Sequence, residues 1–156
     1  MKKKIFTFLL FLFLSSCGYE ATHSLKNRAI YAFSIGELVL TGDRQINLKI
    51  KQMLNPYKNP KLEEEKNFVL NIFSSSEKIV TTRDAAGDAV KFTKEITIDV
   101  QVFVNGEFKS NLVIKEDFIY DNNSNTLDLK TYENEIKINL AEAVVNKLLF
   151  KLVHNL

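Results

Sequence analysis

The segment from Ile96 to Val104 carries apolar side chains at every second position, and this pattern constrains the fold more than any other feature of the chain. The members of the apolar face are Ile96, Ile98, Val100, Val102 and Val104. A period of two predicts a strand in an antiparallel sheet that buries one face and leaves the other in water. Asn105-Gly106 follows directly and is a strong signal for a two-residue hairpin turn. The predicted sheet therefore needs a layer that covers its apolar face.

Two amphipathic helices are predicted, and they are suited to form that layer. The final helix is predicted by an apolar stripe that recurs every four residues: Tyr132, Ile136, Leu140, Val144, Leu148 and Leu152. Segment 126–131 is predicted to lead into it. A shorter helix is predicted to run to about Leu54, with Asp43 as its N-cap and Ile46 and Ile50 on its apolar face.

The remaining strands are predicted from shorter apolar runs. The first lies between Ile30 and Leu40, and the second starts near Lys66 and continues through Thr82, with a bulge at 74–76. The last runs from about Phe108 to Tyr120, and its predicted apolar face is Leu112, Ile114, Phe118 and Tyr120. Glu116 falls on that face by parity, which indicates a satisfied edge position or a bulge.

Together these elements predict an α+β fold with the order β-α-β-β-β-α. In this two-layer sandwich, two helices pack on one face of a four-stranded, mostly antiparallel sheet.

The N-terminus is typical of a bacterial lipoprotein signal peptide. Lys2-Lys3-Lys4 precedes an apolar run of about ten residues, which is too short to span a bilayer as a helix. Ser15-Ser16 then leads to Cys17, the only cysteine of the chain. We expect residues 1–16 to be cleaved and Cys17 to receive a diacylglyceryl and an N-acyl lipid. The alternative is a structural cysteine buried in an ordinary secreted chain.

The sequence downstream of this signal predicts a lipidated tether over 17–28 and a single domain over 29–156. Cleavage of the signal leaves 18 basic residues against 19 acidic ones, so the mature chain lacks the basic excess that general nucleic-acid binding needs. Gly18 rather than aspartate after the lipidated cysteine favours delivery to the outer membrane.

The sequence offers no combination of residues typical of catalysis. His23 and His154 stand without a cysteine or carboxylate cluster at metal-ligand spacing. Asp84 and Asp88 flank a predicted turn, where aspartates are common for conformational reasons. We therefore expect neither an enzyme nor a cofactor or metal other than the covalent lipid on Cys17.

Three cations near the predicted turns are the candidates for ligand contact. Arg83 and Lys91 flank the turn at 84–88, and Lys130 precedes the last helix. In an antiparallel sheet that turn and the entry to the last helix lie at the same end. Phosphates of a lipid head group would form charge-assisted hydrogen bonds with such side chains. The alternative is that the three are unrelated surface charges.

Several segments together resemble the LptE family of lipopolysaccharide-assembly lipoproteins. The segments are Cys17-Gly18-Tyr19, Gly42-Asp43-Arg44-Gln45 through Leu54, Gly87 to Phe92 leading into Ile96–Val104, and Tyr120 followed by a polar loop and a helix over Glu133–Leu152. The resemblance covers most of the mature chain and rests on layout more than on a diagnostic motif.

The resemblance implies a partner, a ligand and a location. The partner is a large outer-membrane β-barrel of the LptD type, in which such a lipoprotein sits as a plug and which it helps to assemble. The ligand is lipopolysaccharide on its way to the cell surface, and the location is the periplasmic face of the outer membrane, reached through the lipid anchor. Arg83 and Lys130 fall where lipid contact is expected in the family, and Lys91 is a weaker candidate.

Other functions remain open at the level of sequence. One is an auxiliary lipoprotein of a lipid-transporting ABC-type envelope complex, and another is an inhibitor or surface-binding module that acts on a soluble target. An enzyme has the least support.

Overall fold

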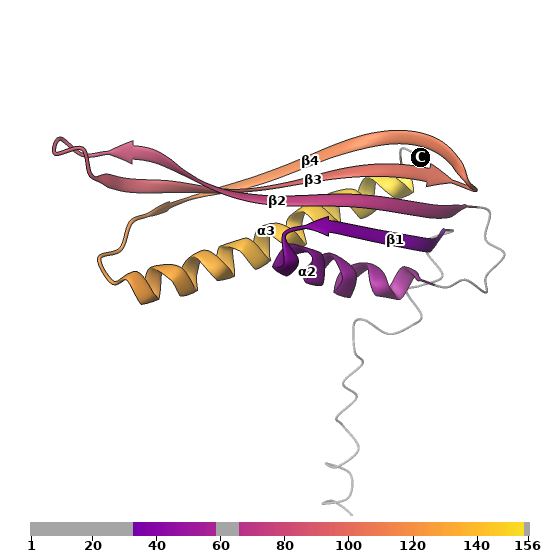
Figure 1. Ribbon diagram of the computed structural model, residues 1–156, viewed down its shortest axis with the longest axis horizontal. Coiled ribbons are helices and arrows are strands. Elements are labelled where there is room, and N and C mark those ends of the chain that lie inside the picture. Colours follow the sequence, from indigo (N-terminus) through magenta and orange to yellow (C-terminus); the bar gives the residue numbers. More distant parts are fainter. Residues whose placement is uncertain (1–32, 59–65, 155–156) are drawn as a thin grey trace, which may run out of the picture. The chain divides into compact units, whose positions relative to one another are not determined.

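The computed structural model describes residues 33–58 and 66–154, which form a four-stranded sheet and helices on one of its faces (Figure 1). The strands are β1 (Ser34–Gly42), β2 (Asn67–Arg83), β3 (Ala89–Val104) and β4 (Glu107–Asp121). The helices are α2 (Arg44–Leu54), the single 3₁₀ turn η2 (Asn55–Tyr57) and α3 (Thr126–His154). The predicted signal peptide, Cys17, His23, the tether and the predicted start of the first strand at Ile30 lie outside the described residues.

The strands lie in the order β1-β2-β3-β4. The β1–β2 pair is parallel, whereas the β2–β3 and β3–β4 pairs are antiparallel. A parallel pair needs a crossover connection, and α2 together with the chain up to Asn67 supplies it. The predicted α+β sandwich with the order β-α-β-β-β-α is confirmed.

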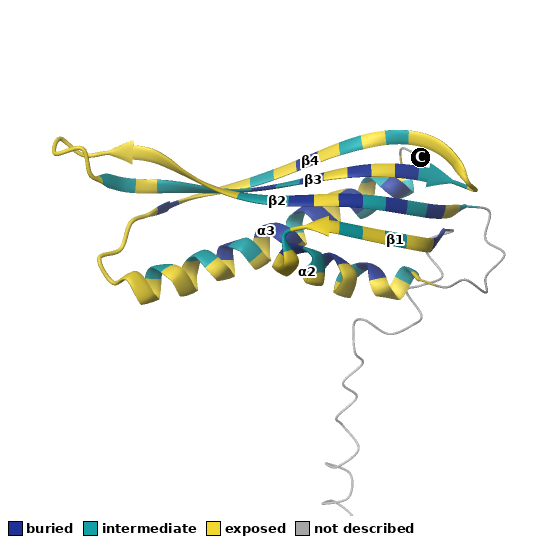
Figure 2. Ribbon diagram, viewed as in Figure 1, coloured by how far each residue is buried: buried dark blue, intermediate teal, exposed yellow. Residues whose placement is uncertain are grey.

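The core lies between the helices and the sheet. Ile96, Ile98, Val100 and Val102 of β3 are buried, as the alternation predicts. Across from them, α3 buries Ile136, Leu140, Ala141, Val144, Val145, Leu148 and Leu152. Figure 2 shows that buried residues gather where both helices face the sheet, whereas the β2–β3 turn and the first turns of α3 are exposed. The sandwich is therefore closed over one half of the sheet and open over the other.

Helix α2 begins where the sequence predicts it. One carboxylate oxygen of Asp43, the N-cap residue, accepts hydrogen bonds from the backbone N–H groups of Gln45 (2.9 Å) and Ile46 (3.2 Å). This satisfies two of the donors that every helix leaves free at its N-terminus. Ile46, Ile50 and Leu54 are buried against the core.

The bulge predicted at 74–76 is wrong. Ser74, Ser75 and Ser76 pair in regular register with Ile98, Thr97 and Ile96, and the irregularity of β2 lies between Val80 and Arg83 instead. Ser74 is buried, and its hydroxyl donates a hydrogen bond to Asn47 Oδ1 at 2.8 Å. A small polar side chain stands there because the β1–α2 junction packs directly against it.

Helix α3 begins at Thr126, about six residues earlier than the apolar stripe predicts. The side-chain oxygen of Asn125 accepts hydrogen bonds from the N–H groups of Leu127 (3.1 Å) and Asp128 (3.4 Å) and so caps the helix. These first turns extend beyond the closed half of the sandwich. As a result Tyr132 and Phe118, both predicted to be in the core, are 43% and 44% exposed.

Of the two alternatives for Glu116, the structure shows an edge position and not a bulge. Glu116 pairs in regular register with Ile96 and forms an ion pair with Lys147 of α3. A carboxylate is tolerated on the inner face of the edge strand because the helix brings a cation to it.

Candidate functional site

The structure places Arg83 and Lys91 on neighbouring strands at the β2–β3 turn. The Arg83 guanidinium donates a hydrogen bond to the carbonyl of Gly87 at 2.8 Å, which ties it to its own turn. The Lys91 ammonium forms an ion pair with Asp121 of β4 at 3.2 Å, and both side chains are at least half exposed. Each of these two cations therefore already has a partner within the domain.

Lys130 lies on an exposed part of α3. The loop that leads to α3 is held to β3 by Asn122, whose backbone N–H donates to Val90 O and whose side-chain amide donates to Ala89 O, both at 2.8 Å. The turn and the entry to the last helix thus share one end of the sheet, as predicted (Figure 1). Among the described residues, no hydrogen bond or ion pair joins Lys130 to Arg83 or Lys91.

A different set of cations converges on the inner face of the sheet, and we call Lys78, Lys94 and Lys137 the lysine cluster. Lys78 of β2 and Lys94 of β3 are direct cross-strand partners. Like charges in such opposed positions repel each other. Lys137 approaches from α3, and its charge also acts on Lys94. Three elements thus bring positive charge to one place, which requires compensation.

Glu133 of α3 supplies the first part of that compensation. Its carboxylate accepts hydrogen bonds from Lys78 Nζ at 2.6 Å and from the Tyr120 hydroxyl at 2.8 Å. Burial raises the pKa of Glu133, but these two hydrogen bonds and the charges of Lys78 and Lys94 outweigh it, so that the pKa is lowered overall. Burial and the hydrogen bond to Glu133 also raise the pKa of Tyr120. Glu133 is therefore a stably ionised centre of the cluster.

Asp43 supplies the second part. The carboxylate that caps α2 also forms an ion pair with Lys137, whose ammonium donates a second hydrogen bond to Gln45 Oε1 at 3.1 Å. Burial raises the pKa of Asp43, but the hydrogen bonds and the charge of Lys137 lower it overall. One aspartate thus joins the start of α2 to the middle of α3.

Lys94 differs from its two neighbours. Within the part of the chain that the structure describes, its ammonium has no hydrogen bond and no ion pair within 4.0 Å. Burial, together with the charges of Lys137 and Lys78, lowers the pKa of Lys94 despite the opposing charges of Glu133 and Asp43. The cluster therefore holds one desolvated cation without a direct partner.

Aromatic rings connect the lysine cluster to a surface pocket. Lys78 Nζ lies 3.8 Å from the centre of the Phe92 ring, and the Phe92 and Tyr120 ring centres are 5.8 Å apart. Tyr120 in turn packs edge-on against Tyr132 at 6.0 Å. The rings thus form a continuous row from β3 through β4 to the first turns of α3.

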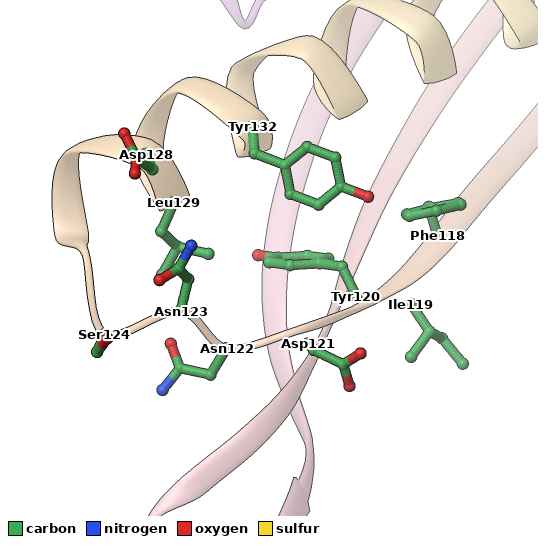
Figure 3. Close-up of a pocket in the computed structure, with 10 residues that line it drawn as sticks. All are labelled: Phe118, Ile119, Tyr120, Asp121, Asn122, Asn123, Ser124, Asp128, Leu129 and Tyr132. Carbon is green, nitrogen blue, oxygen red and sulfur yellow. The ribbon is translucent and has the colours of Figure 1, made fainter.

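The pocket at the end of this row has a volume of about 610 Å³ and lies between β4 and the first turns of α3 (Figure 3). Phe118, Tyr120 and Tyr132 form its aromatic side, and Asn122, Asn123 and Asp128 are among its polar residues. Arg83, Lys91 and Lys130 do not line it. Apolar rings beside a group of cations are suited to an amphiphilic ligand.

The cluster was missed at the level of sequence, although a signal for part of it exists. Lys94 stands two residues before Ile96 and therefore shares its face, and Lys78 continues the face of Phe68, Leu70 and Ile72. A lysine on an apolar face is uncommon unless it is paired. Glu133 and Lys137 are spaced i, i+4 on α3, but their partners from α2 and β2 depend on the tertiary fold.

Over residues 33–58 and 66–154, no group of three or more His, Cys, Asp or Glu side chains is placed to hold a metal ion. None of the helices in these ranges combines the length and the apolar character that a bilayer crossing requires.

Comparison with known proteins places the fold. No family model and no curated protein matches the chain. Solved structures do match it. The crystal structure of rare lipoprotein B from Shewanella oneidensis has a TM-score of 0.55 at 15% identity, over 75% of this chain and 96% of that one. The solution structure of an uncharacterized lipoprotein B from Nitrosomonas europaea has a TM-score of 0.56 at 12% identity, over 87% and 90%.

A third match is a minor lipoprotein from Acinetobacter baumannii, with a TM-score of 0.56 at 10% identity over 77% of this chain and 92% of that one. Identities this low show a shared fold and nothing finer. The coverage of each relative is nearly complete, so the likeness extends over the whole sandwich. The chain therefore has the fold of these bacterial lipoproteins.

Proposed function

We propose that this chain is a lipid-anchored lipoprotein of the bacterial outer membrane that partners a large β-barrel of the LptD type and helps to deliver lipopolysaccharide to the cell surface. The observation that carries the proposal is the fold that the chain shares with several bacterial lipoproteins. The lipidation signal that the sequence predicts, ending in Cys17, agrees with it. Acyl chains on Cys17 would hold the domain at the periplasmic face of the membrane. We propose no catalytic activity and no cofactor beyond this lipid.

The outer face of the sheet is suited to contact a large protein partner. Among the described residues, no second layer covers this face, and it carries exposed apolar side chains on three of its four strands: Val39, Phe73, Ile79, Phe108, Val113 and Ile119. Exposed apolar groups spread over one face are typical of a protein interaction site. A barrel that surrounds the domain would cover this face.

The inner face supports contact with an amphiphilic lipid. Tyr120 joins the lysine cluster to the aromatic pocket, because its hydroxyl donates a hydrogen bond to Glu133 and its ring lines the pocket. Such a surface offers charge to a head group and rings to its apolar parts.

The proposed partnership is tested by isolating the tagged, lipidated protein in mild detergent and identifying by mass spectrometry what co-purifies. We expect a large outer-membrane barrel in a near one-to-one amount. Cys17→Ser, which cannot be acylated, should leave the protein in the soluble fraction and strongly reduce barrel recovery. Recovery of inner-membrane transporter subunits instead, or of no stable partner, would contradict the proposal.

The predicted lipid contacts are tested by reversing two charges. The double variant Arg83→Glu, Lys130→Glu is expected to weaken lipopolysaccharide binding because both cations would be replaced by groups that repel phosphate. Its far-UV circular dichroism should be unchanged, since both side chains are exposed and outside the core. Binding equal to that of the unmodified protein would remove these two residues from the proposal.

A further inference from the structure

Within residues 33–58 and 66–154, one cation of the lysine cluster is not compensated by a carboxylate of its own. Lys78 is neutralised by Glu133 at 2.6 Å and Lys137 by Asp43, so two of the three lysines of the cluster have a carboxylate of their own. Among the described residues, Lys94 has no such carboxylate partner. Three ammonium groups therefore stand against two carboxylates, which leaves one positive charge in the cluster.

Such an arrangement is unfavourable in the absence of a ligand. Burial removes water from the Lys94 ammonium, and Lys78 faces it directly across the strands. The lowered pKa of Lys94 reflects the same conflict. An anion that contacted Lys94 would relieve both the desolvation and the repulsion.

The two nearby carboxylates do not prevent an anion from approaching Lys94, because their negative charges are already matched by other partners. Glu133 is engaged by Lys78 and Tyr120, and Asp43 is engaged by Lys137 and by two backbone N–H groups of α2. Their charges are therefore matched locally, and the excess charge that an incoming anion meets is positive.

We propose that Lys94, with Lys78 and Lys137 beside it, binds an oxyanion of the phosphate class, either a phosphomonoester or free phosphate. The three lysines come from three separate elements, β2, β3 and α3, and a phosphate presents several acceptor oxygens in different directions. A carboxylate ligand would contact fewer of the three lysines. In its lipid form the inference rests on the proposed function, because the phosphate would then belong to the head group of the transported lipid.

The test compares Lys94→Gln with Lys109→Gln in the full chain purified in detergent. Lys109→Gln is the matched control, because it removes the same charge from an exposed position on β4 outside the cluster. Inorganic phosphate is titrated calorimetrically, with sodium chloride at equal ionic strength and acetate as reference anions. We expect phosphate binding in the unmodified protein and in Lys109→Gln, and at least tenfold weaker binding in Lys94→Gln.

Folding of the variant is checked separately. Without phosphate, Lys94→Gln should unfold at or above the temperature of the unmodified protein, because the substitution removes an unpaired, desolvated charge. If it fails to fold, the ε-carbon NMR signal of Lys94 in the unmodified chain still reports contact, and it should shift on addition of phosphate but not of chloride. Phosphate binding that is unchanged in Lys94→Gln, or matched by chloride or acetate, would overturn the inference.

The source of the phosphate is resolved with lipids. Phosphatidic acid in detergent micelles carries a phosphomonoester, whereas phosphatidylcholine carries a diester and no net charge. Binding of phosphatidic acid at least tenfold tighter than that of inorganic phosphate, and dependent on Lys94, would assign the site to a head group. Equal affinities would assign it to free phosphate, and binding of neither would overturn the inference.

The outcomes also separate this inference from the proposed function. A barrel that co-purifies with a protein unable to bind phosphate at Lys94 would contradict the inference alone. Phosphate binding at Lys94 in a protein with no barrel partner would contradict the proposed function alone.

Discussion

Replacing Gly42 with alanine is expected to lower the free energy of unfolding by about 3 kcal/mol, because two costs add at this position. Gly42 has φ +96°, which side-chain-bearing residues rarely adopt. A Cβ atom there would also overlap the carbonyl oxygen of Ser74 and lie 2.9 Å from its carbonyl carbon and backbone nitrogen. Because Ser74 belongs to a central strand, the β1–α2 junction must move away from the sheet. Urea unfolding followed by far-UV circular dichroism measures the loss.

Gly87→Ala is the matched control for this prediction. Gly87 has a similar φ of +91°, but a Cβ atom built on it meets no atom within 4 Å. This variant should lose only the conformational part, about 1 kcal/mol. Equal losses in the two variants would show that contact with Ser74 contributes nothing and would contradict the packing described for the β1–α2 junction.

Glu133→Gln is expected to lower the free energy of unfolding by about 2 kcal/mol. The substitution keeps the shape of the side chain but removes the charge that faces Lys78 and acts on Lys94. The lysine cluster would then keep three ammonium groups with Asp43 as its only carboxylate. The Glu133 side chain is only 19% exposed, so solvent compensates for the lost charge incompletely.

The control for this prediction is Glu142→Gln, which removes a carboxylate from the same helix. Glu142 pairs with Lys49 at 2.8 Å, but its side chain is 50% exposed, so the loss should stay within about 0.5 kcal/mol. Adding Lys94→Gln to Glu133→Gln should recover part of the stability, because it removes one of the repelling cations. A double variant that is less stable than Glu133→Gln alone would contradict the repulsion assigned to Lys94.

The effect of Glu133 is also expected to depend on pH in a defined direction. Its pKa in the folded protein lies below the ordinary value of 4.5. A group whose pKa is lowered by folding contributes stability that is fully present above the unfolded value and is lost as the pH falls through the folded value. The difference in unfolding free energy between the unmodified protein and Glu133→Gln should therefore be constant near neutral pH and shrink below pH 4.5. A difference that grows on acidification would contradict this assignment.

Several local features of the fold follow from residues close together in the sequence. The alternation from Ile96 to Val104 predicts a strand and its buried face because successive side chains of a strand point to opposite sides. Asp43 predicts the start of α2 because a cap acts on N–H groups two or three residues further on. The start of α3 was missed because the apolar stripe served as the signal for this helix, and the helix begins before the stripe does. Its N-cap, Asn125, is also a local signal, but it was not used.

The errors of prediction concern positions where distant segments meet. The serines of β2 were interpreted as a bulge, yet Ser74 lies in a regular part of the strand, where its buried hydroxyl donates a hydrogen bond to Asn47 at the start of α2. Phe118 has the parity of a core residue but is exposed, since the first turns of α3 leave that part of the sheet open. Parity predicts which face a side chain occupies, but not whether another element covers it.

The sequence by itself determined the order of the elements and the apolar face of the sheet, because each depends on residue type at short spacing. The lipidation signal at Cys17 stays a prediction from the sequence. Only the tertiary structure decided which charges compensate one another. Lys78, Lys94 and Lys137 lie on three elements, and their carboxylates belong to α3 and to the residue that caps α2. Electrostatic interaction depends on distance through space and on desolvation, and both arise only when the helices pack on the sheet.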